Sequence, residues 1–232
     1  MLCNFDVKQN KYIGGETIMN FKCISRLSFK NANNTLEDDI KNSPYTSYFW
    51  WHGTPPPPSA IIDDGGINLQ NCGLFFNLYR DISFRPVFTI DFLYNCISIA
   101  SYDVAMMFAE YTNASRRSYT KYRYSLDGAL FTFPNGQPPW VLNKYRRYTW
   151  SSDGKTYRLF FDGKQVAYAN YISDKVGFYL NTHDPDNGGG YAVGVLKYVA
   201  LYALPVTEDF NADEEFTDYY RIYANNNNAY SI

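Results

Sequence analysis

The sequence predicts an all-β protein, an antiparallel β-sandwich with jelly-roll character. Two Asp-Gly pairs, Asp153-Gly154 and Asp162-Gly163, stand close together between short runs in which large apolar and polar residues alternate. Asp-Gly accepts the positive backbone angles of a two-residue hairpin turn, so each pair predicts a tight reversal of an antiparallel sheet. Aromatic residues make up 19% of the chain, with 23 Tyr and 17 Phe, which is typical of sandwiches with aromatic-rich sheet faces.

Residues 1–60 are weakly periodic, and we expect them to form an N-terminal extension or linker before a sandwich domain over 61–232. Residues 21–29 alternate well enough for one strand, and 46–51 are an aromatic run. The proline run 55–58 that follows cannot lie inside a sheet and favours an extended polyproline conformation. It is either a stiff connector or edge-covering loop, or a ligand for a proline-binding module.

From residue 66 the strand signals become regular, as in a β-sandwich and unlike alternating β-α units. Turn signals such as Asp127-Gly128 and Asn135-Gly136 separate short runs that are rich in aromatic and β-branched residues. The runs that predict strands before the two Asp-Gly pairs are 72–78, 87–94, 104–110, 119–125 and 130–133.

The strand between the two Asp-Gly pairs is expected to present two distinct faces. Alternation places Tyr157, Leu159 and Phe161 on one face and Arg158 and Phe160 on the other.

The C-terminal part predicts one short helix packed against the sandwich. Asn211 is suited to cap its N-terminus, and Glu214 stands at the third helical position. Aromatic residues follow at helical spacing, namely Phe216, Tyr219, Tyr220 and Tyr223.

Charge and hydropathy exclude several classes of function. The net charge of −2 gives no field that would recruit nucleic acid or an anionic membrane, so neither is expected as a partner. No apolar run is long enough to span a membrane, and residues 1–16 show no signal-peptide pattern. We therefore expect a chain that is cytoplasmic before assembly and reaches a virion or extracellular surface without a signal peptide, by assembly or lysis, or that stays inside the cell.

The four cysteines, Cys3, Cys23, Cys72 and Cys96, show no Cys-x-x-Cys spacing, so neither a zinc site nor a redox motif is expected. Their even number permits disulfides. A chain of 232 residues can bury a full core without them, so buried free thiols are the prediction.

The order of several short motifs resembles the laminin-G-like group of the concanavalin A-like lectin/glucanase superfamily. The motifs are Phe88-Thr89-Ile90 in one strand, Trp150, the hairpin Asp162-Gly163-Lys164 and the closing phrase Tyr202-Ala203-Leu204. The resemblance covers about residues 66–222 and leaves the first 60 residues without a counterpart. It implies two packed antiparallel sheets. It also implies glycan binding, protein binding or polysaccharide hydrolysis, often in adhesion or virion-surface modules.

Glycoside hydrolysis needs two carboxylates that flank the scissile bond. Glucanases of the resembled superfamily carry acidic residues at every second position of one strand. Here Asp91 is followed at those positions by Leu93 and Asn95, and Glu110 has no acidic residue two positions away. No strand therefore offers an acidic pair on one face, and no catalytic residue is predicted.

The loop 183–190 holds the one metal-like cluster of the sequence. Asp184, Asp186 and Asn187 could supply oxygen ligands for Ca²⁺, the only cofactor that the sequence suggests. The spacing fails the EF-hand pattern, because Val195 stands where a bidentate Glu would be required. A long hairpin loop shaped by proline and glycine, or a sugar contact through Asn187, are the alternatives.

Two segments, 116–124 and 144–148, interleave basic residues with tyrosines. Such a pattern is either a solvated strand face, a protein or glycan interface, or a nucleic-acid surface. Together with a tryptophan after two prolines and the loop asparagine, these segments provide the candidate ligand-binding residues, which are Arg116, Arg117, Tyr122, Tyr124, Trp140 and Asn187.

The function predicted from the sequence is a non-catalytic recognition or assembly module in a larger surface structure. A bacteriophage virion protein is the specific hypothesis, as a capsid-decorating, head-fibre or tail component. Its partners would be other structural proteins, further copies of itself or a surface glycan. A glycoside hydrolase or a free-standing lectin that acts on a polysaccharide is the alternative.

Overall fold

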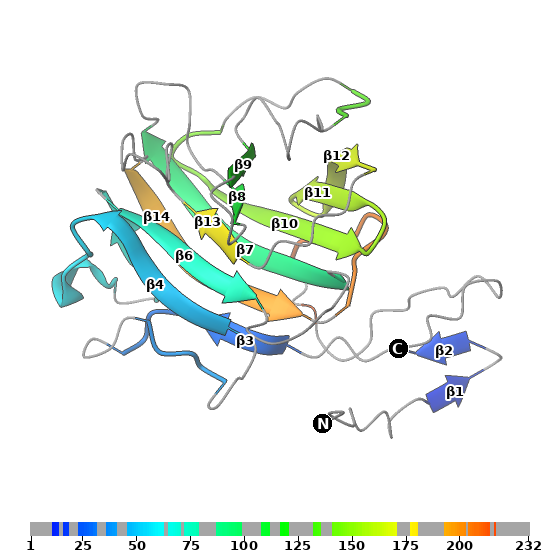
Figure 1. Ribbon diagram of the computed structural model, residues 1–232, viewed down its shortest axis with the longest axis horizontal. Coiled ribbons are helices and arrows are strands. Elements are labelled where there is room, and N and C mark those ends of the chain that lie inside the picture. The colour runs from blue at the N-terminus through cyan, green and yellow to red at the C-terminus, as the bar shows by residue number, and fades with distance from the viewer. Residues whose placement is uncertain are drawn as a thin grey trace.

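Two antiparallel β-sheets pack face to face in the computed structural model (Figure 1). The structure describes residues 11–13, 16–18, 23–31, 36–40, 46–62, 65–70, 72–78, 87–98, 108–111, 117–120, 132–135, 141–170, 177–180, 193–202, 204–213 and 216. Within these residues the only helix is the short 3₁₀ turn η1 (Pro58–Ala60). The predicted class, an all-β antiparallel sandwich, is confirmed.

The larger sheet has seven strands in the order β12-β11-β10-β7-β14-β3, and β5 also pairs with β14. Its strands are β3 (Cys23–Leu27), β5 (Ile67–Leu69), β7 (Val87–Ser98), β10 (Tyr145–Asp153), β11 (Tyr157–Phe161), β12 (Lys164–Ala169) and β14 (Val193–Tyr202).

The smaller sheet has five strands in the order β4-β6-β13-β8-β9. Its strands are β4 (Thr46–Gly53), β6 (Cys72–Leu78), β8 (Phe108–Tyr111), β9 (Arg117–Thr120) and β13 (Gly177–Leu180). A separate hairpin is formed by β1 (Lys11–Ile13) and β2 (Glu16–Ile18).

Most strands lie where the sequence pattern places them, and their ends differ. β6 has the predicted bounds, β7 runs four residues past its predicted end at 94, and β8 and β9 overlap only part of 104–110 and 119–125. In the predicted strand 130–133, Thr132 forms only an isolated bridge to Tyr168. β3 and β4 show that residues before 61 supply a strand to each sheet, while the domain boundary at residue 60 stays a prediction.

The proline run connects the two sheets, since β4 before it belongs to the smaller sheet and β5 after it to the larger. Pro57 has φ −67° and ψ 161°, the polyproline conformation expected from the sequence.

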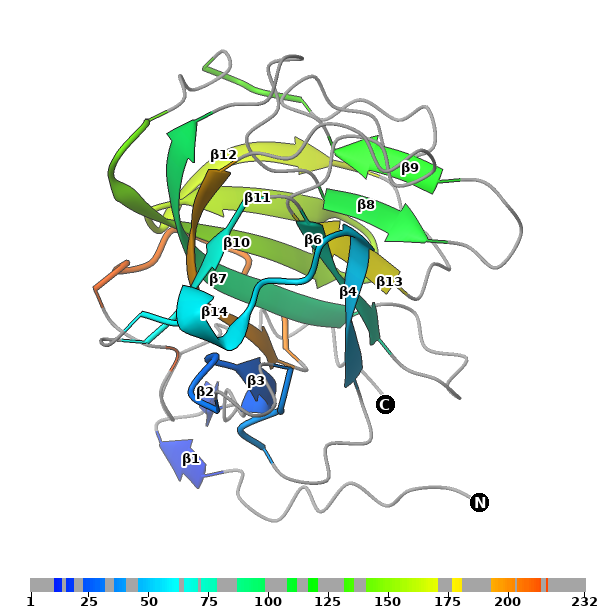
Figure 2. The same cartoon turned by 90° about the vertical axis from the view of Figure 1, so that its left-hand side faces the viewer.

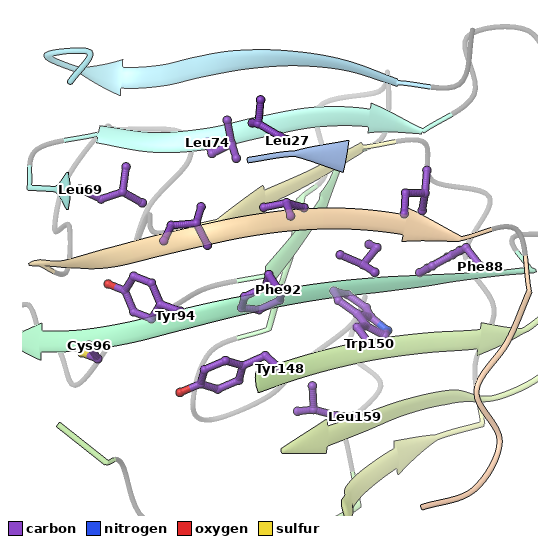
Figure 3. Close-up of a cluster of buried hydrophobic side chains, with 14 of the residues drawn as sticks. Leu27, Leu69, Leu74, Phe88, Phe92, Tyr94, Cys96, Tyr148, Trp150 and Leu159 are labelled. Carbon is purple, nitrogen blue, oxygen red and sulfur yellow. The ribbon is translucent and has the colours of Figure 1, made fainter. Parts of the chain in front are cut away.

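The core lies between the sheets and depends on strict alternation in the central strands (Figure 3). Every second residue of β7 points inward, and these five side chains are at most 1% exposed: Phe88, Ile90, Phe92, Tyr94 and Cys96. The neighbouring strand β10 adds Tyr148 and Trp150, and the Phe92 and Tyr148 rings stack with centroids 5.2 Å apart. Aromatic residues therefore fill the inner face, as the composition indicated.

The side chains of β11 lie on the two faces of the sheet as predicted. Tyr157 and Leu159 are buried in the core between the sheets, and Phe161 packs against that core. Phe160 is fully buried in a second cluster on the opposite face of the sheet.

The two Asp-Gly pairs both reverse the chain, but only the second forms a two-residue turn. Asp162 and Gly163 have φ of 49° and 79°, and the flanking residues Phe161 and Lys164 pair directly. At the first pair, β10 continues through Asp153 and the last paired residues are Ser152 and Tyr157. This turn is longer because the Asp153 carboxylate accepts hydrogen bonds from the backbone N–H groups of residues 155 and 156, both at 2.8 Å.

Asp153→Asn is expected to lower the free energy of unfolding by about 1–2 kcal/mol at pH 7, because charge-assisted hydrogen bonds are lost. Burial opposes ionisation of Asp153, but hydrogen bonds from Arg158, Thr156 and Lys155 outweigh it and hold the pKa of this carboxyl below its usual value. A carboxyl with a depressed folded-state pKa stabilises the protein above its unfolded pKa of about 4 and ceases to do so as the pH falls through the folded value. Urea unfolding should therefore show a difference from wild type that shrinks below about pH 4.

The exposed Asp213 provides the control for this experiment. Asp213→Asn should change the stability by less than about 0.5 kcal/mol at either pH. A difference for Asp153→Asn that persisted at pH 2 would contradict the electrostatic explanation.

The predicted C-terminal helix is not supported. Asn211 Oδ1 does accept a hydrogen bond from the backbone N–H of Asp213 (3.1 Å), but the bond closes a turn, and Phe216 is not helical. Phe216 instead packs its ring against those of Tyr202 and Phe210, with centroids 5.2 and 4.9 Å apart. Residues 217–232 lie outside the described part of the chain. The described helices include none that is long and apolar enough to cross a membrane.

The cysteines in the described residues are free thiols, as predicted. Cys72 and Cys96 are buried and Cys23 is half-buried. Burial raises the pKa of Cys23 and Cys96 to about 11 and that of Cys72 to about 12, so these thiols stay protonated at neutral pH.

Candidate functional site

The outer face of the seven-stranded sheet, which points away from the smaller sheet, is built of cross-strand rows. Directly paired residues of antiparallel strands point to the same side, so the register defines each row. From one end of the sheet to the other, the rows are Ser151–Thr89–Tyr202, Thr149–Asp91–Ala200–Arg26, Arg147–Leu93–Tyr198 and Tyr145–Asn95–Val195–Asn68.

Residues 204–213 and Phe216, here called the C-terminal segment, cover one half of this face. Figure 2 shows the segment on the side of β7 and β10 that faces away from β4, β6 and β13. Thr89 Oγ1 donates a hydrogen bond to the carbonyl oxygen of Leu204 (2.6 Å), and Ser151 Oγ accepts one from the N–H of Val206 (2.6 Å). The polar residues on the outer face thus hold the segment by its backbone.

The covered half contains a buried ion pair. The Arg147 Nε donates to both oxygens of Asp91, at 2.9 and 3.1 Å, and these residues are 6% and 1% exposed. The hydroxyl groups of Thr149 and Tyr198 donate to the same carboxylate, at 2.7 and 2.9 Å. Asp91, considered from the sequence as one half of a catalytic pair, is therefore fully engaged in holding the fold.

Arg147 joins this cluster to the C-terminal segment. Its Nη1 donates to the carbonyl oxygen of Ala212 (2.9 Å), and its guanidinium carbon lies 5.1 and 4.5 Å from the ring centroids of Phe210 and Phe216. Burial alone would lower the pKa of Arg147, but the charge and hydrogen bonds of Asp91 raise it above its ordinary value. The guanidinium therefore stays charged while it is enclosed by aromatic rings.

The other half of the outer face ends in an open corner, defined here as Asn68, Asn95, Ile97, Leu142 and Tyr145. Ile97, Leu142 and Tyr145 are 41%, 43% and 37% exposed and are the exposed large hydrophobic side chains among the described residues. They lie together, because Tyr145 pairs with Asn95 and the N–H of Asn143 donates to the carbonyl oxygen of Cys96 (2.7 Å). Apolar side chains gathered at one exposed place indicate a binding surface.

Two polar residues at the open corner, Asn95 and Lys197, lie near Tyr145. The Oδ1 atom of Asn95 is buried and has no hydrogen-bond partner. The ammonium of Lys197 lies 5.5 Å from the Tyr145 ring centroid. An aromatic ring beside an amide that can both donate and accept is suited to a ligand with an apolar face and hydroxyl groups.

The candidate residues named from the sequence lie almost entirely outside the described residues. The structure does not describe the positions of Arg116, Tyr122, Tyr124, Trp140, Asp184, Asp186 and Asn187. Arg117 is the first residue of β9, the edge strand of the smaller sheet, and its side chain is not described. Calcium binding at 184–187 stays a prediction, and the described residues contain no group of three or more His, Cys, Asp or Glu that could hold a metal.

The basic, tyrosine-rich segment 144–148 is described, and the structure separates its residues. Arg147 and Tyr148 are buried, and Arg146 forms an ion pair with Asp162 (3.1 Å). Lys144 and Tyr145 remain at the surface. Sequence reasoning missed Asn95, Asn68 and Lys197, because they reach the same corner only through pairing of strands that are distant in the chain.

No protein-family model matches the chain, and no curated protein sequence matches it either. Solved structures share its fold. Domain 4 of AbnA, a GH43 extracellular arabinanase from Geobacillus stearothermophilus in complex with arabinotriose, superposes with a TM-score of 0.55 at 12% identity, over 82% of this chain and 96% of that one. Trypanosoma rangeli sialidase in complex with the inhibitor DANA superposes with a TM-score of 0.53 at 13% identity, over 79% of this chain.

The likeness shows the fold, a β-sandwich, because both identities are low. The matched region spans nearly all of the arabinanase domain, whereas it spans 31% of the length of the sialidase. The narrower assignment to the laminin-G-like group stays a prediction.

Proposed function

We propose that this domain is a non-catalytic carbohydrate-binding module and that the open corner holds the sugar. The observation that carries the proposal is the exposed Tyr145 ring, paired across the sheet with Asn95 and placed near the exposed Ile97 and Leu142. A sugar ring has an apolar C–H face that packs on an aromatic ring and hydroxyl groups that bond to amides at its rim.

The buried oxygen of Asn95 supports this proposal. A buried acceptor without a partner costs free energy, so native proteins satisfy nearly all of them. A rotation of the Asn95 side chain that exposes this oxygen would let a ligand hydroxyl or a water supply the missing donor. The shared fold of an arabinanase domain solved with arabinotriose is consistent with a sugar ligand, although identity of 12% carries no residue correspondence.

Tyr145→Ala is expected to weaken glycan binding by about tenfold or more, because truncating an aromatic anchor removes over about 1 kcal/mol. A glycan array would identify a ligand, and isothermal titration calorimetry would then compare wild type with variants. Tyr145→Phe keeps the ring and should retain most of the affinity. Because Tyr145 is 37% exposed, Tyr145→Ala also removes some packing, and the thermal unfolding midpoint shows that the variant remains folded; Tyr145→Phe should leave the midpoint unchanged.

Two results would overturn the proposal. One is a wild-type protein that binds no glycan, and the other is unchanged affinity after Tyr145→Ala. Release of reducing sugar from a polysaccharide would instead favour the glycoside hydrolase alternative.

The virion setting, as a phage surface protein with structural partners, stays a prediction from the sequence. A sugar-binding module is compatible with it, since such a module attaches a larger assembly to a surface glycan.

A further inference from the structure

We propose that the glycan held at the open corner carries a methyl group, supplied by an acetamido group or by a 6-deoxy sugar, and that this methyl packs against Ile97 and Leu142. This inference rests on the proposed function and names the ligand class of the same site.

Ile97 is an apolar residue that β7 presents to solvent beside the proposed sugar site. Its neighbour Cys96 belongs to the core between the sheets and is 1% exposed (Figure 3). Ile97 is 41% exposed and therefore points away from that core. It comes two residues after Asn95, the partner of Tyr145, and so lies about 7 Å further along the strand.

Leu142 is held near Ile97 by the backbone that follows it. The N–H of Asn143 donates to the carbonyl oxygen of Cys96 (2.7 Å), so the chain neighbours of Leu142 and Ile97 are bonded to each other. Asn143 has φ +56°, a left-handed conformation that asparagine adopts more readily than most residues. Leu142 is 43% exposed, so this local structure holds an apolar side chain in solvent beside the end of β7.

The two aliphatic side chains add a second apolar element to the ring of Tyr145. Single exposed apolar residues are common at protein surfaces, but the described residues gather all their exposed large hydrophobic side chains at this corner. A sugar that packs its C–H face on Tyr145 would direct a substituent toward Ile97 and Leu142. A hydroxyl group there would lose water without gaining a hydrogen bond, whereas a methyl group would bury apolar surface.

Glycans carry such a methyl group in two forms. An acetamido group holds it beside an N–H and a carbonyl oxygen, and the amide of Asn95 is able to bond to either. A 6-deoxy sugar holds it on the sugar ring in place of a hydroxymethyl group. Both forms present the same apolar group to Ile97 and Leu142, so the experiment must separate them.

The test uses pairs of uncharged oligosaccharides that differ at the methyl group. The first pair is chitotriose and its N-formyl counterpart, which lacks only the methyl groups. The second pair is an L-rhamnose trisaccharide and its L-mannose counterpart, which has hydroxymethyl groups instead. In a pair that binds, we expect calorimetry to show about three- to tenfold tighter binding of the methyl-bearing form, since burying one such group contributes about fourfold.

The pair that shows this preference identifies the source of the methyl group. The preference should be the same at about 0.05 and 0.5 M NaCl, because neither member of a pair is charged.

Ile97→Thr and Leu142→Gln should each lower the affinity for the methyl-bearing form about two- to fivefold more than that for its counterpart. Both residues are over a third exposed, so the variants should remain folded, which thermal unfolding checks. Val166→Thr is the matched control, because it makes a comparable exchange on β12, where Val166 packs against the core on the other face of the sheet. It should leave the ratio of the two affinities unchanged.

Equal binding of the two members of each pair that binds would overturn this inference while leaving sugar binding in place. Binding confined to glycans with neither methyl form, such as xylan or arabinan oligomers, would do the same. A preference that survived both Ile97→Thr and Leu142→Gln would show that these side chains do not contact the methyl group. Absence of binding to any glycan would overturn the proposed function, and this inference with it.

Discussion

Replacing Arg147 by methionine is expected to lower the free energy of unfolding by about 3–5 kcal/mol, because removing one partner of a buried ion pair leaves the other uncompensated. Asp91 is 1% exposed and would keep only the hydroxyl groups of Thr149 and Tyr198 as donors. The carbonyl oxygen of Ala212 would also lose its donor. Urea unfolding at pH 7 measures the loss.

The double variant Asp91→Leu/Arg147→Met tests the electrostatic cause. It removes both charges, so much of the lost stability should return. Lys164→Gln is the surface comparison, since the Lys164–Asp209 pair is 73% and 48% exposed and should contribute under about 1 kcal/mol. A loss for Arg147→Met as small as that for Lys164→Gln would show that the buried pair does not hold the C-terminal segment.

Gly163→Ala is expected to cost about 2–4 kcal/mol, from backbone strain and a steric clash together. Gly163 has φ +79°, and a Cβ atom there would lie 2.0 Å from the carbonyl oxygen of Phe210. The backbone is already tied at this point, because the N–H of Phe210 donates to the carbonyl oxygen of Gly163 (2.9 Å). The C-terminal segment would have to move, so hydrogen exchange should increase at residues 206 and 210 in particular.

Gly65→Ala separates the strain from the clash. Gly65 has φ +86° but no atom within 4 Å of an added Cβ. It should therefore cost only about 1–2 kcal/mol, the left-handed conformation being the sole penalty. Equal losses at Gly65 and Gly163 would show that contact with the C-terminal segment contributes nothing.

The motif Asp162-Gly163-Lys164, on which the family resemblance was partly based, has a structural explanation. The Asp162 carboxylate accepts a hydrogen bond from the N–H of Arg147 (2.9 Å), Gly163 lies against Phe210, and Lys164 pairs with Asp209. Each residue of the motif thus joins the hairpin to β10 or to the C-terminal segment. A short motif of this kind reports how a sandwich is closed, and it carries no information about the ligand.

The candidate site was less accessible to sequence reasoning than the fold. The segment 144–148 mixes basic residues with tyrosines, a pattern that predicts an interface, yet burial leaves only Lys144 and Tyr145 at the surface. For Asn95 the sequence indicates only that it stands where a glucanase of the resembled superfamily would have an acidic residue. Asn95 lies beside Tyr145 because β7 pairs with β10, and Lys197 lies near the Tyr145 ring because of a bulge in β14. No local sequence pattern indicates either feature.

The sequence by itself determined the all-β class, the second hairpin turn, most of the strands and the two faces of β11. These features depend on local backbone preference and on the two-residue period of side chains, both of which act between neighbours in the chain. Only the tertiary structure decided which polar residues are buried, which half of the sheet the C-terminal segment covers and which corner stays open. Burial depends on what distant segments place over a residue, so of two residues four positions apart on one face of β7, Asp91 is buried with all its hydrogen bonds made, while Asn95 is half-buried with its amide oxygen unpartnered.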